Sequence, residues 1–174
     1  QETDTKQLKM LQVTYAGNLG EGQGLHNILP QLAKILEGRV EFKVIGDGGR
    51  RAQLEAELNS NGVTNVKMLP PVNRSELIEI YQKSDILFLH LNDYPAFKKG
   101  LPSKIVEYAA TGKPVWAGVS GYAADFLNAE VENSAVFEPG NHQQALQLLD
   151  SLDTKVTKRE DFITKYSRKN IMTK

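Results

Sequence analysis

Apolar residues gather in short, nearly continuous runs along this chain, and the segments between the runs repeat apolar positions every three to four residues. Such runs predict buried β-strands, and the segments between them predict amphipathic helices. The predicted strands are residues 8–16, 40–45, 66–69, 85–89, 115–117 and 135–137. The predicted helices are residues 25–36, 50–61, 73–83, 103–111, 123–127 and 143–152. Because helical crossovers join the strands, we predict an α/β fold, a Rossmann-like doubly wound parallel six-stranded sheet covered on both faces.

Capping residues and glycines set the predicted helix ends. Asn73 and Glu76 have the spacing of a capping box, and Ser103 is a good N-cap. Gly62 and Gly112 each follow the last residue of a predicted helix, where a left-handed glycine is common.

The length of 174 residues, with 40% apolar and 24% charged residues, suffices for one full-sized core. We place this domain at residues 8–153. Residues 1–7 are polar and do not begin with Met, so we expect them to be disordered or an artificial addition to a trimmed chain. Residues 159–174 are predicted to form a basic helix. Its apolar residues, which need a surface to pack on, are Phe162, Ile163, Tyr166 and Ile171.

Charge and cysteine content exclude several classes of function. The 21 basic and 21 acidic residues cancel, so there is no global electrostatic case for a nucleic acid or an anionic membrane, and an anion site must be local. The absence of cysteine excludes disulfides and thiolate chemistry and favours the cytoplasm. No apolar run reaches membrane-spanning length.

The most informative stretch is residues 100–115, which combines a helix start, a lysine and a glutamate. Pro102 cannot continue a preceding strand, so the helix is predicted to begin at Ser103, and its first N–H groups suit a phosphate. Lys104 adds a formal charge, and Glu107 lies on the same helical face, where it would accept hydrogen bonds from sugar hydroxyls. The alternative is an N-capped helix with a surface ion pair.

Three further segments follow predicted strands at the edge where ligands bind in open α/β sheets. Residues 17–24 are rich in glycine and either cradle a phosphate or form only a tight turn, since their spacing does not match the dinucleotide fingerprint. After the glycines of residues 46–49, Arg50 and Arg51 either meet a phosphate or face solvent. His90 is a weak candidate, because a lone histidine at such a place is more often structural.

The motifs of metal-assisted and nucleophilic catalysis do not occur in the sequence. There is no His-x-x-x-His pair, no Asp-x-Asp pair, no glycine-flanked serine elbow and no Walker phosphate loop. We therefore expect neither a metal site nor a cofactor.

With these loops placed, the sequence resembles the C-terminal, nucleotide-sugar-binding domain of retaining glycosyltransferases of the GT-B fold, the glycosyl transferase group 1 family. The resemblance covers most of the chain. It rests on Tyr15-Ala16-Gly17-Asn18 with Gln23-Gly24-Leu25, Val44-Ile45-Gly46-Asp47-Gly48, Leu69-Pro70-Pro71-Val72, Ser84-Asp85-Ile86, and Leu101-Pro102-Ser103-Lys104 through Glu107 to Gly112-Lys113-Pro114-Val115. The Pro-Ser-Lys helix start is most similar to transferases that build bacterial surface polysaccharides.

The resemblance implies a donor site along the strand ends. The diphosphate would lie at the helix start beside Lys104, and Glu107 matches the second glutamate of the family's Glu-x7-Glu motif, which binds ribose hydroxyls. The base would lie near Gly46 and Pro71, and residues 17–24 would face the phosphates and an interdomain cleft. The implied donor-binding residues are Gly17, Asn18, Gln23, Gly24, Gly46, Asp47, Pro71, Pro102, Ser103, Lys104 and Glu107.

Two departures from the family pattern concern charge. Lys99, with Lys98 beside it, stands where the motif has its first glutamate, and Asn18 and Gln23 replace basic residues that are frequent in the first loop. Lys98 or Lys99 either stabilises the leaving diphosphate or is a solvated loop lysine. The catalytic residues stay undetermined.

The resemblance implies that the whole protein transfers a sugar from a nucleoside diphosphate to an acceptor with retention and without a metal, in surface polysaccharide or glycoconjugate synthesis. The partners would be a nucleotide-sugar donor and a missing N-terminal acceptor domain. Residues 159–174 would pack on that domain. Peripheral contact with a membrane is possible through the same missing domain. This chain alone would bind the donor without turnover. The alternatives are half of a nucleotide-sugar 2-epimerase and a non-enzymatic, flavodoxin-like nucleotide-binding module.

Overall fold

A computed structural model describes residues 10–155, 159–160 and 162–165. The strands are β1 (Leu11–Ala16), β2 (Val40–Ile45), β3 (Val66–Leu69), β4 (Ile86–His90), β5 (Val115–Gly118) and β6 (Ser134–Phe137). The helices are α2 (Leu25–Ile35), α3 (Arg51–Ser60), α4 (Arg74–Lys83), the 3-10 helix η1 (Pro95–Phe97), α5 (Ser103–Ala110), α6 (Gly121–Glu130) and α7 (His142–Leu149).

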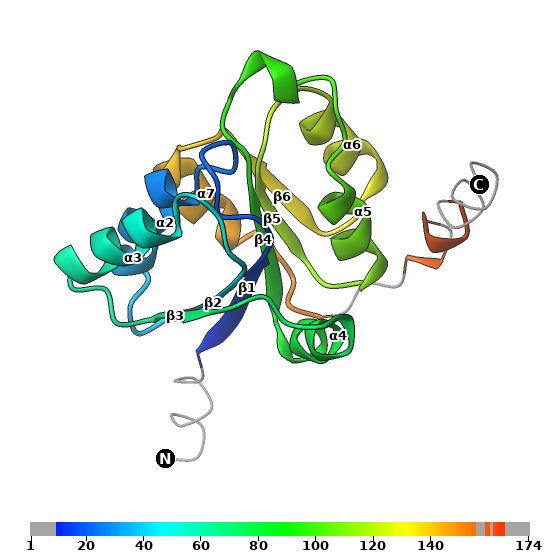
Figure 1. Ribbon diagram of the computed structural model, residues 1–174. Helices are drawn as coiled ribbons and strands as arrows, with labels where there is room; N and C mark the ends of the chain where they lie inside the picture. The colour runs from blue at the N-terminus through cyan, green and yellow to red at the C-terminus, as the bar shows by residue number, and fades with distance from the viewer. Residues whose placement is uncertain (1–9, 156–158, 161, 166–174) are drawn as a thin grey trace.

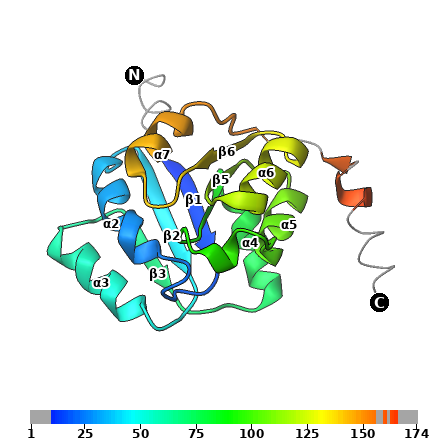
Figure 2. The ribbon, with the colours of Figure 1, turned by 90° about the horizontal axis from the view of Figure 1, so that it is seen from above.

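The strands form one sheet in the order β3-β2-β1-β4-β5-β6, and every neighbouring pair is parallel. Helices α2, α3 and α7 cover one face, and α4, α5 and α6 cover the other (Figure 1). Seen from above, the sheet lies between these two layers (Figure 2). This is the strand order of the Rossmann fold, whose direction of winding reverses between β1 and β4. The predicted doubly wound six-stranded sheet is confirmed.

Alternating strand side chains fill a core on each face of the sheet. In β1, Val13 and Tyr15 join the core that includes residues of α2, α3 and α7, whereas Ala16 joins the core that includes residues of α5 and α6. Every residue of the central strand β4 is buried. The indole of Trp116 is fully buried, and its Nε1 donates to the Ala145 carbonyl at 3.0 Å. These cores hold the carboxyl ends of the strands along one edge, where the candidate loops meet.

The glycine and capping signals are confirmed at three helix ends. The backbone N–H of Glu76 donates to the Asn73 side chain at 2.9 Å. Gly62 and Gly112, with φ of 63° and 78°, follow the ends of α3 and α5 in the left-handed conformation.

Helix α5 begins at Ser103 as predicted, but Ser103 is not its N-cap, and the bounds of α6 and α7 differ from the prediction. Pro102 occupies the cap position, and its carbonyl accepts the N–H of Ile105 at 3.0 Å, so Ser103 is the first helical residue. The backbone of Pro102 is extended, with ψ of 135°, so Pro102 is the last residue before the helix. With Ser103 as the cap, the first helical residue would instead have been residue 104. Helix α6 extends beyond residues 123–127 at both ends, and α7 stops at Leu149.

The start of the C-terminal segment packs on this domain. Arg159 is buried and donates to the carbonyls of Ala109 and Glu132 at 2.8 and 2.6 Å, and the ring of Phe162 lies 6.1 Å from that of Phe126. Burial lowers the pKa of Arg159 to about 10, so its guanidinium is still charged at neutral pH. Residues 1–7, and the predicted apolar positions Tyr166 and Ile171, lie outside the described residues.

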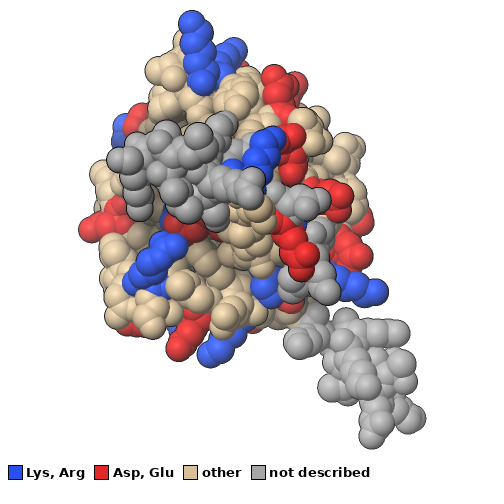
Figure 3. Space-filling view, turned by 90° about the vertical axis from the view of Figure 1, so that its right-hand side faces the viewer, with Lys and Arg blue, Asp and Glu red and all other residues tan. Residues whose placement is uncertain are grey.

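Among the described residues no helix is both long enough and apolar enough to cross a membrane. On the face shown in Figure 3, acidic and basic side chains of the described residues are interspersed.

Candidate functional site

The site begins where β1 and β4 part. Their pairing covers Val13 with Ile86 and Thr14 with Leu87. Beyond it, the fully buried Tyr108 of α5 lies between the two strands: its hydroxyl accepts the N–H of Ala16 at 2.9 Å and donates to the Phe88 carbonyl at 3.0 Å. Tyr108 therefore satisfies backbone groups that the diverging strands leave without a sheet partner, and a crevice opens at the carboxyl edge.

A pocket of about 300 Å³ lies beside this crevice, at the ends of β1 and β2 and the loop after β3, and is within the size range of small-molecule sites. Its apolar end is formed by strand ends and the start of α4, and its polar end by the first two loops and α5. The lining residues are Ala16, Gly17, Asn18, Ile45, Gly46, Asp47, Pro71, Val72, Leu77 and Lys104.

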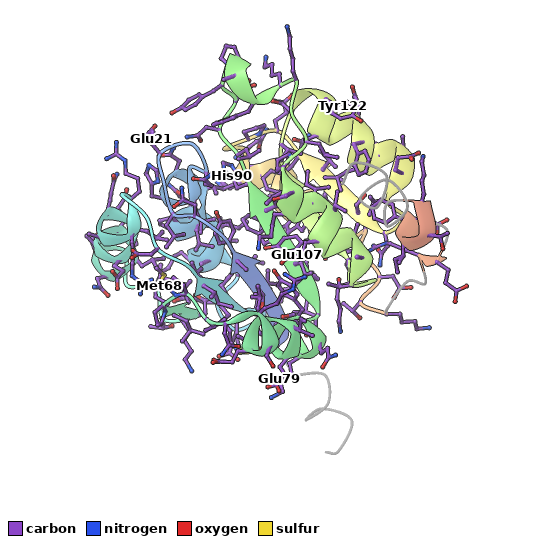
Figure 4. The ribbon with its side chains drawn as sticks, turned by 45° about the vertical axis from the view of Figure 1, so that its right-hand side comes forward. Glu21, Met68, Glu79, His90, Glu107 and Tyr122 are labelled. Atoms are coloured by element: carbon purple, nitrogen blue, oxygen red, sulfur yellow. The ribbon has the colours of Figure 1, made fainter. Side chains whose placement is uncertain are left out.

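Helices α4 and α5 bring four polar side chains together beside this pocket. Glu107 Oε2 accepts a hydrogen bond from the Tyr81 hydroxyl at 2.5 Å and from Lys104 Nζ at 3.1 Å. Its Oε1 lies 3.7 Å from the guanidinium of Arg74, which is exposed. In Figure 4, Glu107 projects from α5 into the space beside α4. Tyr81 and Lys104 thus bond to one carboxylate oxygen, whereas the other lies near the exposed Arg74.

Burial of Glu107 disfavours its charged form, but the hydrogen bond from Tyr81 and the charges of Lys104 and Arg74 outweigh burial and hold the pKa of its carboxyl below the ordinary value. Burial, together with the hydrogen bond to Glu107, raises the pKa of the Tyr81 phenol. Glu107 is therefore a charged acceptor at neutral pH, and Tyr81 keeps its proton as a donor.

The first loop, residues 17–24 after β1, and the second loop, residues 46–50 after β2, contact each other through backbone atoms. The N–H of Gly17 donates to the Ile45 carbonyl at 3.0 Å, and that of Leu19 donates to the Asp47 carbonyl at 2.9 Å. A Cβ added at Gly46 would lie 1.9 Å from the Gly17 oxygen. Glycine is required here because any side chain would force the two loops apart.

Two polar side chains of the first loop, those of Asn18 and Gln23, bond within that loop. Gln23 Oε1 accepts hydrogen bonds from Asn18 Nδ2 at 3.1 Å and from the N–H of Gly20 at 3.2 Å. Gly24 has φ of 63°, and a Cβ there would lie 2.0 Å from Asn92 Oδ1. Of the predicted residues of this loop, Gly17 and Asn18 line the pocket, and Gln23 and Gly24 hold the shape of the loop.

The two arginines that follow β2, Arg50 and Arg51, both bond to other groups of the protein. Arg51 donates to the carbonyls of Gly46 and Leu69 at 2.6 and 3.2 Å, and so joins the ends of β2 and β3. Arg50 lies 2.9 Å from a carboxylate oxygen of Glu21.

His90 links the loop after β1 to the loop after β6. Its Nε2 accepts the N–H of Gly140 at 2.9 Å, so the ring proton is on Nδ1, which donates to the Gln23 carbonyl at 2.7 Å. Burial lowers the pKa of His90, which keeps the ring neutral. Both nitrogens are used, as expected of a structural histidine.

The two candidate lysines lie on the exposed loop that contains η1. Lys98 Nζ is 3.4 Å from Asp93, whose carboxylate also accepts a hydrogen bond from Ser120. Lys98 and Lys99 do not line the pocket, whereas Lys104 does.

Arg74 and Leu77 are site residues that we did not predict, and so are the two tyrosines, Tyr81 and Tyr108. Both occupy buried positions of helices, and a buried tyrosine hydroxyl requires a hydrogen-bond partner. That requirement was the available signal, but the sequence does not reveal the partners. Among the described residues, no group of three or more His, Asp or Glu is placed to hold a metal ion.

Comparisons with known proteins found relatives by sequence and by structure. The family model described as "Glycosyl transferases group 1" matches residues 2–169. The putative colanic acid biosynthesis glycosyl transferase WcaI of Escherichia coli (strain K12) is 29% identical over 100 residues, which are 58% of this chain and 24% of that protein.

Two solved structures share the fold. One of S. aureus TarM has a TM-score of 0.74 at 17% identity, covering 95% of this chain and 35% of that chain. The C-terminal domain of the group 1 protein LpcC from Francisella tularensis has a TM-score of 0.67 at 20% identity, covering 93% of this chain and 89% of that domain. This chain therefore spans about a quarter of WcaI and about a third of TarM. Because the family model matches nearly the whole chain, the protein belongs to the glycosyl transferases group 1 family.

Proposed function

We propose that this chain binds the nucleotide-sugar donor of a GT-B glycosyltransferase. The observation that carries the proposal is the Lys104–Glu107 pair beside the crevice pocket, in a chain whose family transfers sugars. The first turn of α5, with Pro102, Ser103 and Lys104, would hold the diphosphate, and Glu107 would accept hydrogen bonds from the ribose.

The base would occupy the apolar end of the pocket. Ile45, Val72 and Leu77 line the pocket together with Gly46 and Pro71, so a flat ring can be buried there. The matched TarM structure contains UDP, which supports a nucleoside diphosphate as the ligand class.

In the whole protein, we propose transfer of the sugar to an acceptor with retention, in surface polysaccharide or glycoconjugate synthesis, as the WcaI match supports. The acceptor site would lie on a further domain, so this chain alone would bind the donor without transferring the sugar. Helix-terminal N–H groups and Lys104 would stabilise the diphosphate without a metal. Lys98 or Lys99 would add charge if the loop moves toward the leaving group.

Calorimetric titration with UDP, GDP, ADP and dTDP, with and without EDTA, tests donor binding. We expect one of these ligands to bind, and to bind equally well with EDTA. Binding that requires Mg²⁺ or Mn²⁺ would refute the metal-independent site, and no binding of any of the four would refute the donor site itself.

Product analysis of the whole protein separates the reaction classes. A transferase yields a glycosylated acceptor, and the proton coupling at its anomeric carbon reports retention or inversion. A sugar epimerised at C2, either free or still attached to the nucleotide, would instead identify a nucleotide-sugar 2-epimerase. Binding without any of these products would indicate a nucleotide-binding module.

A further inference from the structure

Glu21, in the first loop, bonds through its carboxylate to two other loops at the carboxyl edge of the sheet. One oxygen, Oε1, lies 2.9 Å from the guanidinium of Arg50 in the second loop. The other, Oε2, accepts a hydrogen bond from the hydroxyl of Tyr94, in the loop between β4 and α5 that contains η1. In Figure 4, Glu21 lies at the end of the first loop nearest to the loop that contains η1. One side chain thus joins the three loops that follow β1, β2 and β4.

Backbone contacts on both sides of Glu21 continue this attachment. Asn92 Nδ2 donates to the Glu21 carbonyl at 2.6 Å, and the N–H of Asn92 donates to the Gly22 carbonyl at 2.8 Å. On the other side, the N–H of Arg50 donates to the Leu19 carbonyl at 2.8 Å. Residues 19–22 therefore contact both neighbouring loops, and Glu21 is the one residue of these four that has a polar side chain.

The groups around Glu21 favour its ionised form. They come from each element that faces it: Tyr94 from the loop that contains η1, Arg50 from the second loop, and His26 from α2, whose Nε2 lies 3.9 Å from Oε1. The hydrogen bond from Tyr94 is the main cause that holds the pKa of Glu21 below its ordinary value, and Arg50 and His26 act in the same direction against desolvation. Glu21 is therefore a carboxylate at neutral pH. Its contacts should weaken as pH falls through its pKa in the folded protein, because protonation removes the charge that holds Arg50.

All three joined loops contribute to the proposed donor site. Gly17 and Asn18 of the first loop and Gly46 and Asp47 of the second line the pocket, and the loop after β4 leads into α5, which carries Lys104. A ligand that contacts these elements needs them ordered together. Order that exists before binding reduces the entropy cost of binding.

We propose that Glu21 is a positioning residue of the donor site: its carboxylate clamps the loops after β1, β2 and β4 into one arrangement, and this arrangement sets the affinity for a nucleoside diphosphate. Glu21 does not line the pocket, so it acts through the loops rather than on the ligand. The effect on binding rests on the proposed function, whereas the clamp itself can be measured without a ligand.

Amide hydrogen exchange of Glu21→Gln tests the clamp. The amides to follow are those of Arg50 and Asn92, which lie in the other two loops. We expect both to exchange about tenfold faster than in the wild type, while amides of the sheet, such as that of Val44, keep their protection. Glu138→Gln is the matched control, because Glu138 is exposed at the same edge of the sheet, directly after β6. Faster exchange confined to residues 17–24 would overturn the inference.

The pH dependence of exchange separates the carboxylate from a purely steric role of this side chain. In the wild type, the protection of the Arg50 and Asn92 amides should fall as pH is lowered from about 6 to about 3, because Glu21 becomes protonated. In Glu21→Gln this fall should be absent, since the side chain is already neutral, and protection at Val44 reports that the sheet stays folded. A fall of equal size in both proteins would overturn the inference.

Tyr94→Phe breaks one arm of the clamp and takes the place of Glu21→Gln if that variant does not fold. It removes the donor to Oε2 and leaves Arg50 at Oε1. We therefore expect faster exchange at the Asn92 amide, with the Arg50 amide unchanged. Unchanged exchange at Asn92 would overturn the inference.

Calorimetric titration with the nucleoside diphosphate that the wild type binds tests the link to the donor site. We expect Glu21→Gln to bind it about fivefold more weakly, because the ligand must then order the loops itself, and Glu138→Gln to bind it as the wild type does. Loosened loops with unchanged affinity would overturn the positioning role. No binding by the wild type would overturn the proposed function and the positioning role with it, while the exchange pattern would still show whether Glu21 clamps the loops.

Discussion

The two sides of the crevice pocket are built differently. On the α5 side, charged and phenolic side chains contact one another, with Glu107 between Tyr81 and Lys104. On the loop side, Gly17 and Gly46 approach through backbone atoms. The polar side chains nearby bond to other groups of the two loops or to the strand ends, as Asn18 does to Gln23 and Arg50 does to Glu21. The α5 side can therefore be altered one hydrogen bond at a time, whereas the loop side can be altered only by changing its shape.

The largest expected effect comes from breaking the loop side. Gly46→Ala places a Cβ 1.9 Å from the Gly17 oxygen, at a φ of 151° that side chains rarely adopt. We expect the free energy of unfolding to fall by about 2–5 kcal/mol, which is roughly 5–15 °C in Tm for a chain of this size. Thermal denaturation measures this. Gly49→Ala is the control, because its Cβ meets no atom within 4 Å; similar losses in both variants would contradict the clash.

Removing the charge on the α5 side should affect the ligand more than the fold. We expect Glu107→Gln to weaken nucleoside diphosphate binding by about 10- to 150-fold, the loss of roughly 1.5–3 kcal/mol for a hydrogen bond to a charged group. Inorganic pyrophosphate should bind as well as before or better, because Lys104 loses a competing carboxylate. Titration of both ligands tests this, with Glu79→Gln as control, since Glu79 lies on α4 away from Glu107 (Figure 4). Equal losses for both ligands would indicate a structural role for Glu107.

A smaller and pH-dependent effect is expected from Tyr81→Phe. The lowered pKa of Glu107 contributes stability that is present above the ordinary carboxyl pKa and is lost as pH falls through the folded value. Without the Tyr81 donor, this pKa rises toward the ordinary value, although Lys104 and Arg74 still face the carboxylate. On acidification, nucleoside diphosphate binding should therefore decline at a higher pH than in the wild type, with about a fivefold loss at neutral pH. Titrations between about pH 4 and 7 measure the profile, and the exposed Tyr122→Phe is the control. An unshifted profile would refute the coupling.

The smallest effect on binding is expected from Gln23→Ala. Gln23 accepts two hydrogen bonds within its loop, so we expect the free energy of unfolding to fall by about 1–2 kcal/mol and affinity to change less than about threefold. Chemical denaturation measures the free energy of unfolding, and nucleoside diphosphate titration measures the affinity. A large loss of affinity at unchanged stability would show that Gln23 contacts the ligand and would remove the contrast between the two sides.

The contrast also explains which features could be predicted from the sequence. Strands, the Asn73 cap and the glycine at residue 112 depend on local spacing, and these predictions are confirmed. The contact between Tyr81 and Glu107 depends on how α4 packs on α5 across 26 residues of chain, which no local pattern specifies. From the sequence, Arg51 either meets a phosphate or faces solvent, but in the structure it donates to two backbone carbonyls. These acceptors lie at the ends of β2 and β3, which only the folded sheet brings together.

The backbone contact between the first two loops also bears on how this domain can be re-engineered. Gly46 leaves no room between its loop and Gly17, and the N–H of Arg50 donates to the Leu19 carbonyl at 2.8 Å, so residues 17–24 and 46–50 form one module. Grafting a single loop from another transferase would pair surfaces that were never fitted to each other. Exchange of donor preference between such enzymes should therefore succeed when both loops are transferred as a matched set.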